Sequence, residues 1–169
     1  MFPKQNIERN LNVQIATSGV MDNAISLWLQ MYENNPPWLG GEEDIKSMNL
    51  PAAIAEEFAR LILTEFEFNL EGSARAEFLN QQFENYLNNF DNIIEMWGAL
   101  GGIAIKPYVS GTDPVTGKPD RIQLDFVQAN RFYPTAFNSN KEITGAVFID
   151  TQRVGDYLYT RLEHHSLEN

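Results

Sequence analysis

The chain contains no cysteine and only two histidines among its 169 residues. Without cysteine there is no disulfide framework, no thiol catalysis and no cysteine-based zinc site. The two histidines, His164 and His165, are neighbours in a segment expected to be a strand. Neighbours on a strand point to opposite faces, so these two side chains are poorly placed to chelate one metal ion. A surface position or a cross-strand contact is the expected role of both.

Long apolar runs are also missing. No stretch approaches the roughly 20 apolar residues that a membrane span requires. The first ten residues are polar and lack the apolar segment of a signal peptide. Together these absences predict a cytoplasmic protein with no membrane partner.

Basic residues are scarce, with 12 Lys and Arg against 23 Asp and Glu, a net charge of −11. Residues 42–95 hold twelve acids and three bases, a net of −9, whereas residues 1–41 and 96–169 each have a net of −1. Neutralising phosphate groups requires the opposite sign, which argues against a surface that grips DNA. Solvated helix faces are the expected place for these acids.

Hydrophobic residues make up 43% of the chain, and their spacing predicts the elements. Residues 1–17 are polar with scattered Ile and Val, and we expect a polar N-terminal arm that is extended or loosely packed. Helical periodicity follows over 18–34, 49–68 and 73–97, the last being the longest segment. The second of these helices carries a stripe that we expect to be buried, with spacings of four, three and one. The stripe consists of Ile54, Phe58, Leu61 and Ile62.

After residue 102 the period changes from helical to alternating. Strands are expected over 103–109, 121–127, 142–151 and 157–167, whereas residues 129–134 are expected to lead into a turn. Helices first (18–97) and strands second (103–169) predict one α+β domain over 18–169 with an antiparallel sheet. The last strand would have an unpaired edge, so we expect the natural chain to continue.

Candidate chemistry was sought in four further patterns. Gly98–Gly102 runs from a helix into a strand, the reverse of a phosphate-binding loop. The acidic pairs Glu42-Glu43 and Glu56-Glu57 have no converging apolar groups that would tune a general acid or base. The loop Asp113–Gly117 lacks the regularly spaced acids of a calcium loop. We therefore predict no catalytic, cofactor-binding or metal-binding residue, and a protein that is not an enzyme.

Several strings, taken in order, resemble the portal proteins of long-tailed phages and prophages of Gram-positive bacteria. The resemblance extends over nearly the whole chain from about Ala16, and it depends on serial order rather than on any one string. The strings are MYEN (31–34) with PWL (37–39), SMNLPAAIA (47–55) with EFARL (57–61), GSARA (72–76), GGIAIKPY (101–108), DFVQANRFYPTA (125–136), ITGAVF (143–148) and YTRLE (159–163).

This resemblance implies a fold and a role. Portal proteins are closed homo-oligomeric rings of about a dozen subunits at one capsid vertex. They nucleate head assembly, dock the terminase, contact capsid or scaffold and head-completion proteins, and form the channel through which double-stranded DNA passes without specific binding. The chain would be a wing region, truncated before the stem and clip, in a virion subunit assembled in the bacterial host cytoplasm. No cofactor is implied.

Two other classes stay open. One is a non-catalytic α+β protein-binding module with an exposed aromatic patch, for which Trp38, Phe132 and Tyr133 are the candidates because they lie in or beside expected turns; core packing is the alternative for each. The other is a hydrolase of unknown type, which would need polar groups clustered in a deep pocket. Within the portal hypothesis, Glu84 and Glu95 could face the channel, and reversing both to Lys would then increase DNA retention.

Overall fold

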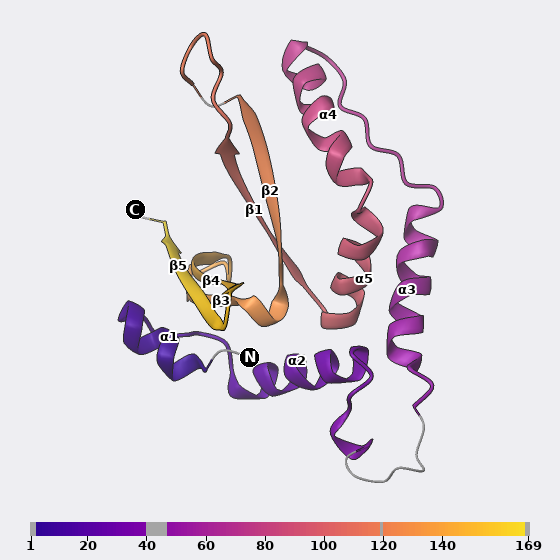
Figure 1. Cartoon of the computed structure of the whole chain (residues 1–169), viewed down its shortest axis with the longest axis vertical. Helices are drawn as coiled ribbons and strands as arrows, with labels where there is room; N and C mark the ends of the chain where they lie inside the picture. Colours follow the sequence, from indigo (N-terminus) through magenta and orange to yellow (C-terminus); the bar gives the residue numbers. More distant parts are fainter. Residues whose placement is uncertain (1–2, 40–46, 119, 168–169) are drawn as a thin grey trace.

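The computed structural model describes residues 3–39, 47–118 and 120–167, and this part of the chain contains five α-helices and five strands (Figure 1). All strand pairs found there are antiparallel, so the fold is α+β, as predicted. The helices are α1 (Lys4–Leu11), α2 (Gly19–Tyr32), α3 (Leu50–Leu63), α4 (Ala74–Leu87) and α5 (Phe90–Leu100). The strands are β1 (Ile103–Ser110), β2 (Arg121–Gln128), β3 (Phe132–Phe137), β4 (Ile143–Val154) and β5 (Tyr157–Ser166).

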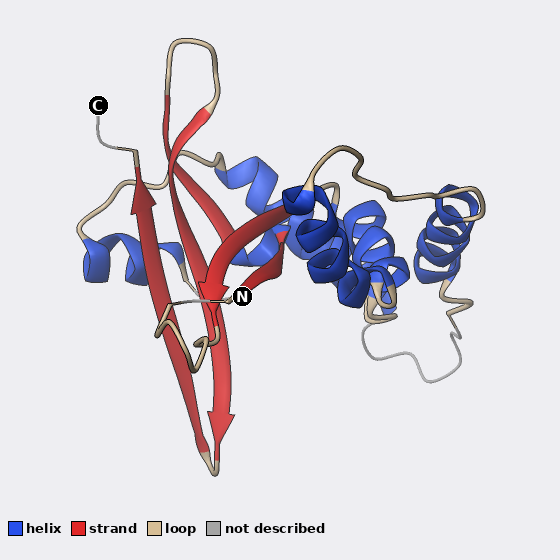
Figure 2. Cartoon of the chain, turned by 90° about the horizontal axis from the view of Figure 1, so that it is seen from above, coloured by secondary structure: helices blue, strands red, loops and turns tan. Residues whose placement is uncertain are grey.

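The strands form two sheets instead of the single sheet expected. β1 and β2 make a two-stranded sheet, and β3, β4 and β5 make a second sheet in that order. A 3-10 turn at Ala129–Arg131 separates β2 from β3 and redirects the chain, so that β3 pairs with β4 rather than extending the first hairpin. Figure 2 shows the long β4–β5 hairpin extending well beyond the rest of the molecule.

The prediction of an extended or loosely packed N-terminal arm is wrong, because Lys4–Leu11 is a helix that packs on the second sheet. Ile7 has no exposed surface. The carboxylate of Glu8 accepts a hydrogen bond from the Ile15 N–H at 3.0 Å, which fixes the chain after the helix. A helix that buries only one narrow side has a largely polar composition, as this segment does. The core cluster comprises Ile7, Ile15, Tyr133, Val147 and Ile149.

The first two predicted helices are confirmed as α2 and α3. Ser18 caps α2, since its hydroxyl accepts the Met21 N–H at 3.2 Å. Pro51 lies in the first turn of α3, where its missing N–H costs no helical hydrogen bond. The helix α3 ends at Leu63, earlier than the predicted boundary at residue 68.

The third predicted helix, 73–97, is two helices, α4 and α5, separated at Asn88 and Asn89. Asn89 has φ −127° and ψ 20°, outside the helical region. Asparagine side chains compete with the helical backbone for hydrogen bonds, which favours a break at two consecutive asparagines. Tyr86 and Phe90, on either side of the break, both contact the ring of Phe126 on β2, with centroids 5.9 and 6.4 Å away.

Strand β3 was missed, because the segment 129–134 was expected to lead into a turn. β3 is an edge strand, which tolerates Pro134, and its pairing with β4 shifts register between Pro134 and Ala136. The four predicted strands are confirmed as β1, β2, β4 and β5, with ends that differ by up to three residues. A tight turn joins β3 to β4, where Asn138 Oδ1 accepts the N–H groups of Asn140 and Glu142, both at 2.9 Å.

The molecule has little core for its size. A compact protein of 19.3 kDa has an accessible surface of about 8,500 Å², whereas this chain has 12450 Å². Within the described ranges, nine apolar side chains are buried and 26 large apolar side chains are exposed. The fold as it stands therefore leaves much apolar surface in water.

Candidate functional site: a charged cleft and an apolar groove

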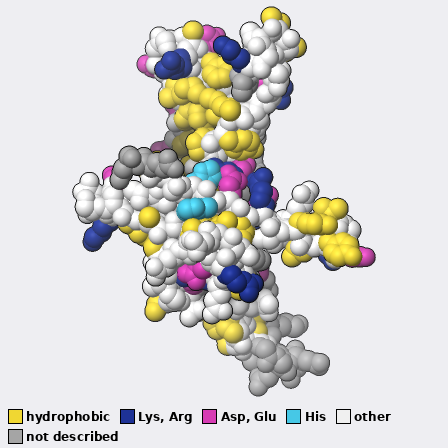
Figure 3. Space-filling model, turned by 90° about the vertical axis from the view of Figure 1, so that its left-hand side faces the viewer, with side chains coloured by type: hydrophobic (Ala, Val, Ile, Leu, Met, Phe, Trp, Pro, Cys, Tyr) yellow, Lys and Arg dark blue, Asp and Glu magenta, His cyan; other side chains and the backbone are white. Residues whose placement is uncertain are grey.

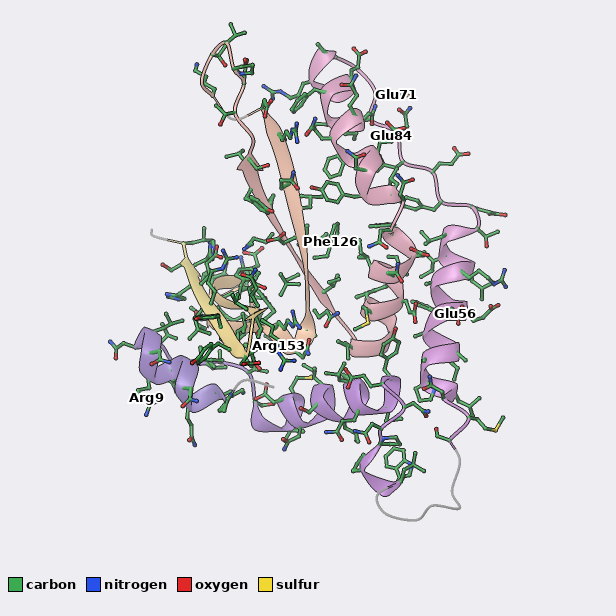
Figure 4. The ribbon with its side chains drawn as sticks, viewed as in Figure 1. Arg9, Glu56, Glu71, Glu84, Phe126 and Arg153 are labelled. Atoms are coloured by element: carbon green, nitrogen blue, oxygen red, sulfur yellow. The ribbon has the colours of Figure 1, made fainter. Side chains whose placement is uncertain are left out.

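A cavity of about 650 Å³ lies between α4, α5 and the two sheets. Its wall combines the aromatic rings of Tyr86, Phe126 and Phe148 with charged groups of both signs. Figure 4 labels Phe126 in the space between β2 and α5. We call this cavity the charged cleft.

Lys106 is at the centre of the charged cleft and joins the two sheets. Its ammonium group lies 3.4 Å from the Asp125 carboxylate on β2. It also donates a hydrogen bond to the Glu163 carboxylate on β5 at 3.1 Å. The ammonium lies 5.5 Å from the centre of the Phe148 ring on β4, within the range of a cation–π contact. One side chain thus connects β1 to β2, β4 and β5.

Glu163 has further partners besides Lys106. A ring nitrogen of His165 lies 2.7 Å from the second carboxylate oxygen, and the Arg161 guanidinium lies 3.7 Å from the first. The hydrogen bond with His165, and then that with Lys106, holds the pKa of Glu163 below its usual range. Figure 3 shows the two histidines near the middle of this face, beside acidic and basic side chains.

The chemistry of the charged cleft favours a connecting role. A nucleophilic lysine requires the neutral amine, which apolar or cationic surroundings promote, whereas Lys106 lies between two carboxylates. A general base is effective when its pKa is near the working pH, and the pKa of Glu163 is shifted in the other direction. The groups therefore neutralise one another and hold the sheets together.

A second cavity, about 410 Å³, is a groove between α2, α3 and α5 with an almost wholly apolar lining. We call it the apolar groove. Phe58, one of its lining residues, packs against Trp97 with ring centroids 5.8 Å apart. A Cβ at Gly98 would come within 3.0 Å of Phe58, so glycine permits the close approach of α5 to α3. The lining residues are Trp28, Met31, Tyr32, Pro51, Ile54, Ala55, Phe58, Gly98 and Ala99.

The polar group at the edge of the apolar groove is Tyr32. Its hydroxyl donates a hydrogen bond to the Glu95 carboxylate on α5 at 2.8 Å. Burial, together with this hydrogen bond, raises the pKa of Tyr32 to about 12. Glu95 therefore helps to hold α2 against α5 and does not form part of a freely solvated acidic face.

The stripe of α3 that was predicted to be buried is exposed, and this prediction is wrong for the chain by itself. Small residues, Ala55 and Ala59, are the buried residues of α3, and α5 is its main neighbour. The apolar surface of α3 is thus wider than its contact with α5, which covers the alanines and part of Phe58. The exposed fractions are 67% for Ile54, 41% for Phe58, 61% for Leu61 and 39% for Ile62.

The aromatic patch considered for a binding module does not form. Tyr133 is 2% exposed and belongs to the core cluster, because β3 places it opposite Val147. Phe132 is half-buried and packs on Phe148 with centroids 5.3 Å apart. Only Trp38, 62% exposed, has the accessibility that such a patch needs.

The other candidate residues lie apart from one another. Gly101 ends α5 with φ 74°, as expected for a helix C-terminus. The Asp113 carboxylate accepts the Val115 N–H at 2.7 Å and the Thr116 hydroxyl at 2.8 Å, and these bonds hold its pKa below the usual range. Glu57 is exposed and pairs with Arg60 on the same helix.

Glu42 and Glu43 lie outside the described residues. His164 and His165 make separate contacts, with Thr135 and Glu163 respectively. Residues 3–39, 47–118 and 120–167 contain no group of three or more His, Asp or Glu side chains placed to hold a metal ion. In the same ranges no helix combines the length and apolar character needed to cross a bilayer.

Comparison of the chain with protein-family models, with curated proteins and with solved structures finds no match.

Sequence reasoning missed both the charged cleft and the apolar groove. Lys106 and Glu163 are 57 residues apart, and each is one charge in an alternating strand, so nothing in the sequence pairs them. The apolar groove did leave a signal, because α3 has apolar residues at helical spacing in addition to its alanines. The pattern predicts an apolar face, but it does not show whether the same chain or another copy covers that face.

Proposed function

We propose that this chain is the N-terminal, wing part of a phage or prophage portal protein, and that it works as a structural subunit of a homo-oligomeric ring. Its partners through the intact protein would be terminase, capsid or scaffold, and head-completion proteins. Double-stranded DNA would pass the channel without specific binding. The place of action would be the virion, after assembly in the bacterial host cytoplasm.

One observation carries this proposal. The chain exposes 12450 Å², which exceeds the surface of a compact monomer of this mass by about 4,000 Å². Interfaces of permanent assemblies bury about 2,000–5,000 Å² in total. An excess of this size supports a subunit whose surfaces are covered by other copies and by neighbouring proteins. The serial resemblance of the sequence strings to portal proteins supports the choice of assembly.

Two further features support the proposal. The net charge of −11 disfavours tight binding of DNA, which a channel must let slide. The groups of the charged cleft neutralise one another and hold two sheets together, which suits a load-carrying subunit.

Negative-stain electron microscopy and light scattering of the longest natural form of the protein test the proposal. Rings with a central hole, and a mass that is a multiple of the subunit mass, are expected. A monodisperse monomer at all accessible concentrations would contradict it.

A non-catalytic binding module is the second candidate, and the apolar groove is the observation that favours it. A module of this kind would stay monomeric, and the melting temperature would rise when its peptide partner is added. Light scattering therefore separates the two functions before any partner is known.

The hypothesis that Glu84 and Glu95 face the channel can be tested with only one of these two residues. Glu95 accepts a hydrogen bond from Tyr32, so reversing its charge would disturb the packing of α2. Glu84 is exposed on α4 and is the usable probe. If α4 faces the channel, Glu84→Lys increases DNA retention by assembled particles; unchanged retention removes the idea.

A further inference from the structure

We propose that the tip of the β4–β5 hairpin of one copy inserts into the apolar groove of the next copy, in a head-to-tail contact. This inference rests on the proposed homo-oligomer and names the surfaces that build it. We call residues 153–159, which include the turn at Gly155 and Asp156, the hairpin tip.

The hairpin tip is apolar and uncovered. Its exposed fractions are 54% for Val154, 72% for Tyr157, 68% for Leu158 and 59% for Tyr159. Gly155, at φ 61°, closes a two-residue turn between Val154 and Tyr157, which makes the tip narrow. Large apolar side chains at the end of a projecting hairpin have no role in the core of their own chain (Figure 2).

Each face of the hairpin tip carries at least one exposed apolar side chain. Val154 pairs with Tyr157, and Tyr159 follows two positions later, so these three share one face. Leu158 pairs with Arg153 and lies on the opposite face. A narrow element with exposed apolar side chains on both faces buries most surface when it enters a groove, and least when it lies on a flat surface.

The apolar groove is the matching concave surface. It has a volume of about 410 Å³, and its rim includes Ile54, which is 67% exposed. The exposed stripe of α3 continues from this rim to Leu61, 61% exposed, and would be covered by the same contact. The groove and the stripe together supply an apolar receiving surface on one side of the molecule.

The hairpin tip carries one base, Arg153, and one acid, Asp156 in its turn, and Arg153 is the charge that an acid beside the apolar groove can meet. Arg153 at the hairpin tip makes no ion pair with any residue that the structure describes. Glu56, beside the apolar groove on α3, likewise has no cationic partner within the described ranges. Contact between copies would bring an unpaired cation near an unpaired anion.

The geometry requires two copies. Figure 4 labels Arg153 at the second sheet and Glu56 on α3, on different sides of the molecule, and Figure 2 also separates the hairpin tip from the helices. A chain cannot insert its own tip into its own groove. Tip-to-tip contact is disfavoured because it would oppose two convex surfaces and bury little area. A contact between two different surfaces repeats from copy to copy and closes into a ring when the rotation allows.

The absence of cysteine from the chain makes cross-linking a direct test. One copy carries Tyr157→Cys and a second, differently tagged copy carries Ile54→Cys; the two are mixed and oxidised with copper phenanthroline. We expect a disulfide-linked heterodimer. Its yield should be at least about tenfold higher than the yield with the control pair Val115→Cys and Ile54→Cys, which corresponds to about 1.4 kcal/mol in the free energy of bringing the two cysteines together. Val115 is 90% exposed in the β1–β2 loop, so it reports random collision.

The outcomes separate this inference from the proposed function. If light scattering shows self-association but the mixed pair links no more than the control, the tip-to-groove contact is wrong and the oligomer stands. A Tyr157→Cys copy that links mainly to itself also overturns it, in favour of a tip-to-tip contact. If this chain and its longest natural form both stay monomeric, the tip-to-groove contact and the proposed homo-oligomer are both wrong.

A charge swap gives a second readout that does not depend on oxidation. Arg153→Glu is expected to weaken self-association about fivefold, since an exposed charge pair contributes about 1 kcal/mol. Combining it with Glu56→Arg restores the original association if the two residues meet. If circular dichroism shows that both variants are folded and the double variant still associates weakly, the contact between Arg153 and Glu56 is wrong.

Discussion

At the scale of single residues, the core depends on a few large side chains, and Ile7 is one that has no exposed surface. Ile7→Ala is expected to lower the free energy of unfolding by about 2–5 kcal/mol, because the cavity adds to the lost burial. Urea denaturation measures it. Val20→Ala is the matched control on α2, 81% exposed, and should change stability by less than about 0.5 kcal/mol. Equal effects of the two variants would mean that α1 is not docked on the second sheet.

Two tyrosines make stability depend on alkaline pH. Burial, and then the charge of Asp22, raises the pKa of Tyr133 to about 12 from an ordinary value of 10.0, and Tyr32 also has a pKa of about 12. Above pH 10 the unfolded chain loses these protons while the folded chain keeps them. The two tyrosines therefore contribute fully to the free energy of unfolding below pH 10, and their contribution declines as the pH rises to about 12.

Denaturation series between pH 8 and 12 test this dependence. Tyr133→Phe removes one titrating group and its hydrogen bond to the Asn130 carbonyl, 3.3 Å long. This substitution should lower the free energy of unfolding by about 1 kcal/mol at neutral pH, and the free energy of unfolding should then fall less steeply above pH 10. In the double variant with Tyr32→Phe this fall should be less steep still. An unchanged slope in the double variant contradicts the assignment to these residues.

At the scale of elements, the end of α5 depends on one backbone conformation. Gly101 has φ 74°, and a Cβ there would lie 3.4 Å from the Trp28 ring. Gly101→Ala is expected to destabilise the protein by about 1 kcal/mol, because side chains disfavour this region. Gly102→Ala is the adjacent control, with no positive φ and open space around its Cβ. Thermal unfolding should separate the two variants, and equal melting temperatures would contradict the role of the turn.

The link between the two sheets is a second property of elements. A double-mutant cycle with Lys106→Met and Glu163→Gln should give a coupling energy of about 1 kcal/mol at pH 7. Because the pKa of Glu163 is lowered, the stabilisation is present above the ordinary carboxyl pKa and is lost as the pH falls through the lower folded value. A coupling near zero at pH 7 would mean that Lys106 does not join the sheets.

At the scale of the whole molecule, the large accessible surface has a measurable consequence. The unfolded chain exposes about 28,000 Å² and a compact native state about 8,500 Å², whereas this native chain exposes 12450 Å². Unfolding of the isolated chain therefore exposes about 20% less new surface than is usual for its length. The urea m-value should be about 20% below that of compact domains of this size, and it should rise on assembly. A normal m-value for the monomer would contradict so open a native state.

The sequence by itself determined the order and type of most elements. Local signals were sufficient where they acted within a few residues: the Ser18 cap, Pro51 in the first turn of α3, Gly101 after α5 and the alternating residues of β1, β2, β4 and β5. Capping, turn and periodicity signals depend on neighbours in the chain, which a single sequence displays.

Only the tertiary structure decided what these elements contact. Ile7 docks on a sheet more than a hundred residues later, Lys106 meets Glu163, and the stripe of α3 stays uncovered. The edge strand β3 likewise depends on its pairing with β4. A hydrophobic pattern specifies that a face avoids water, but it does not specify whether its own chain or another copy covers that face.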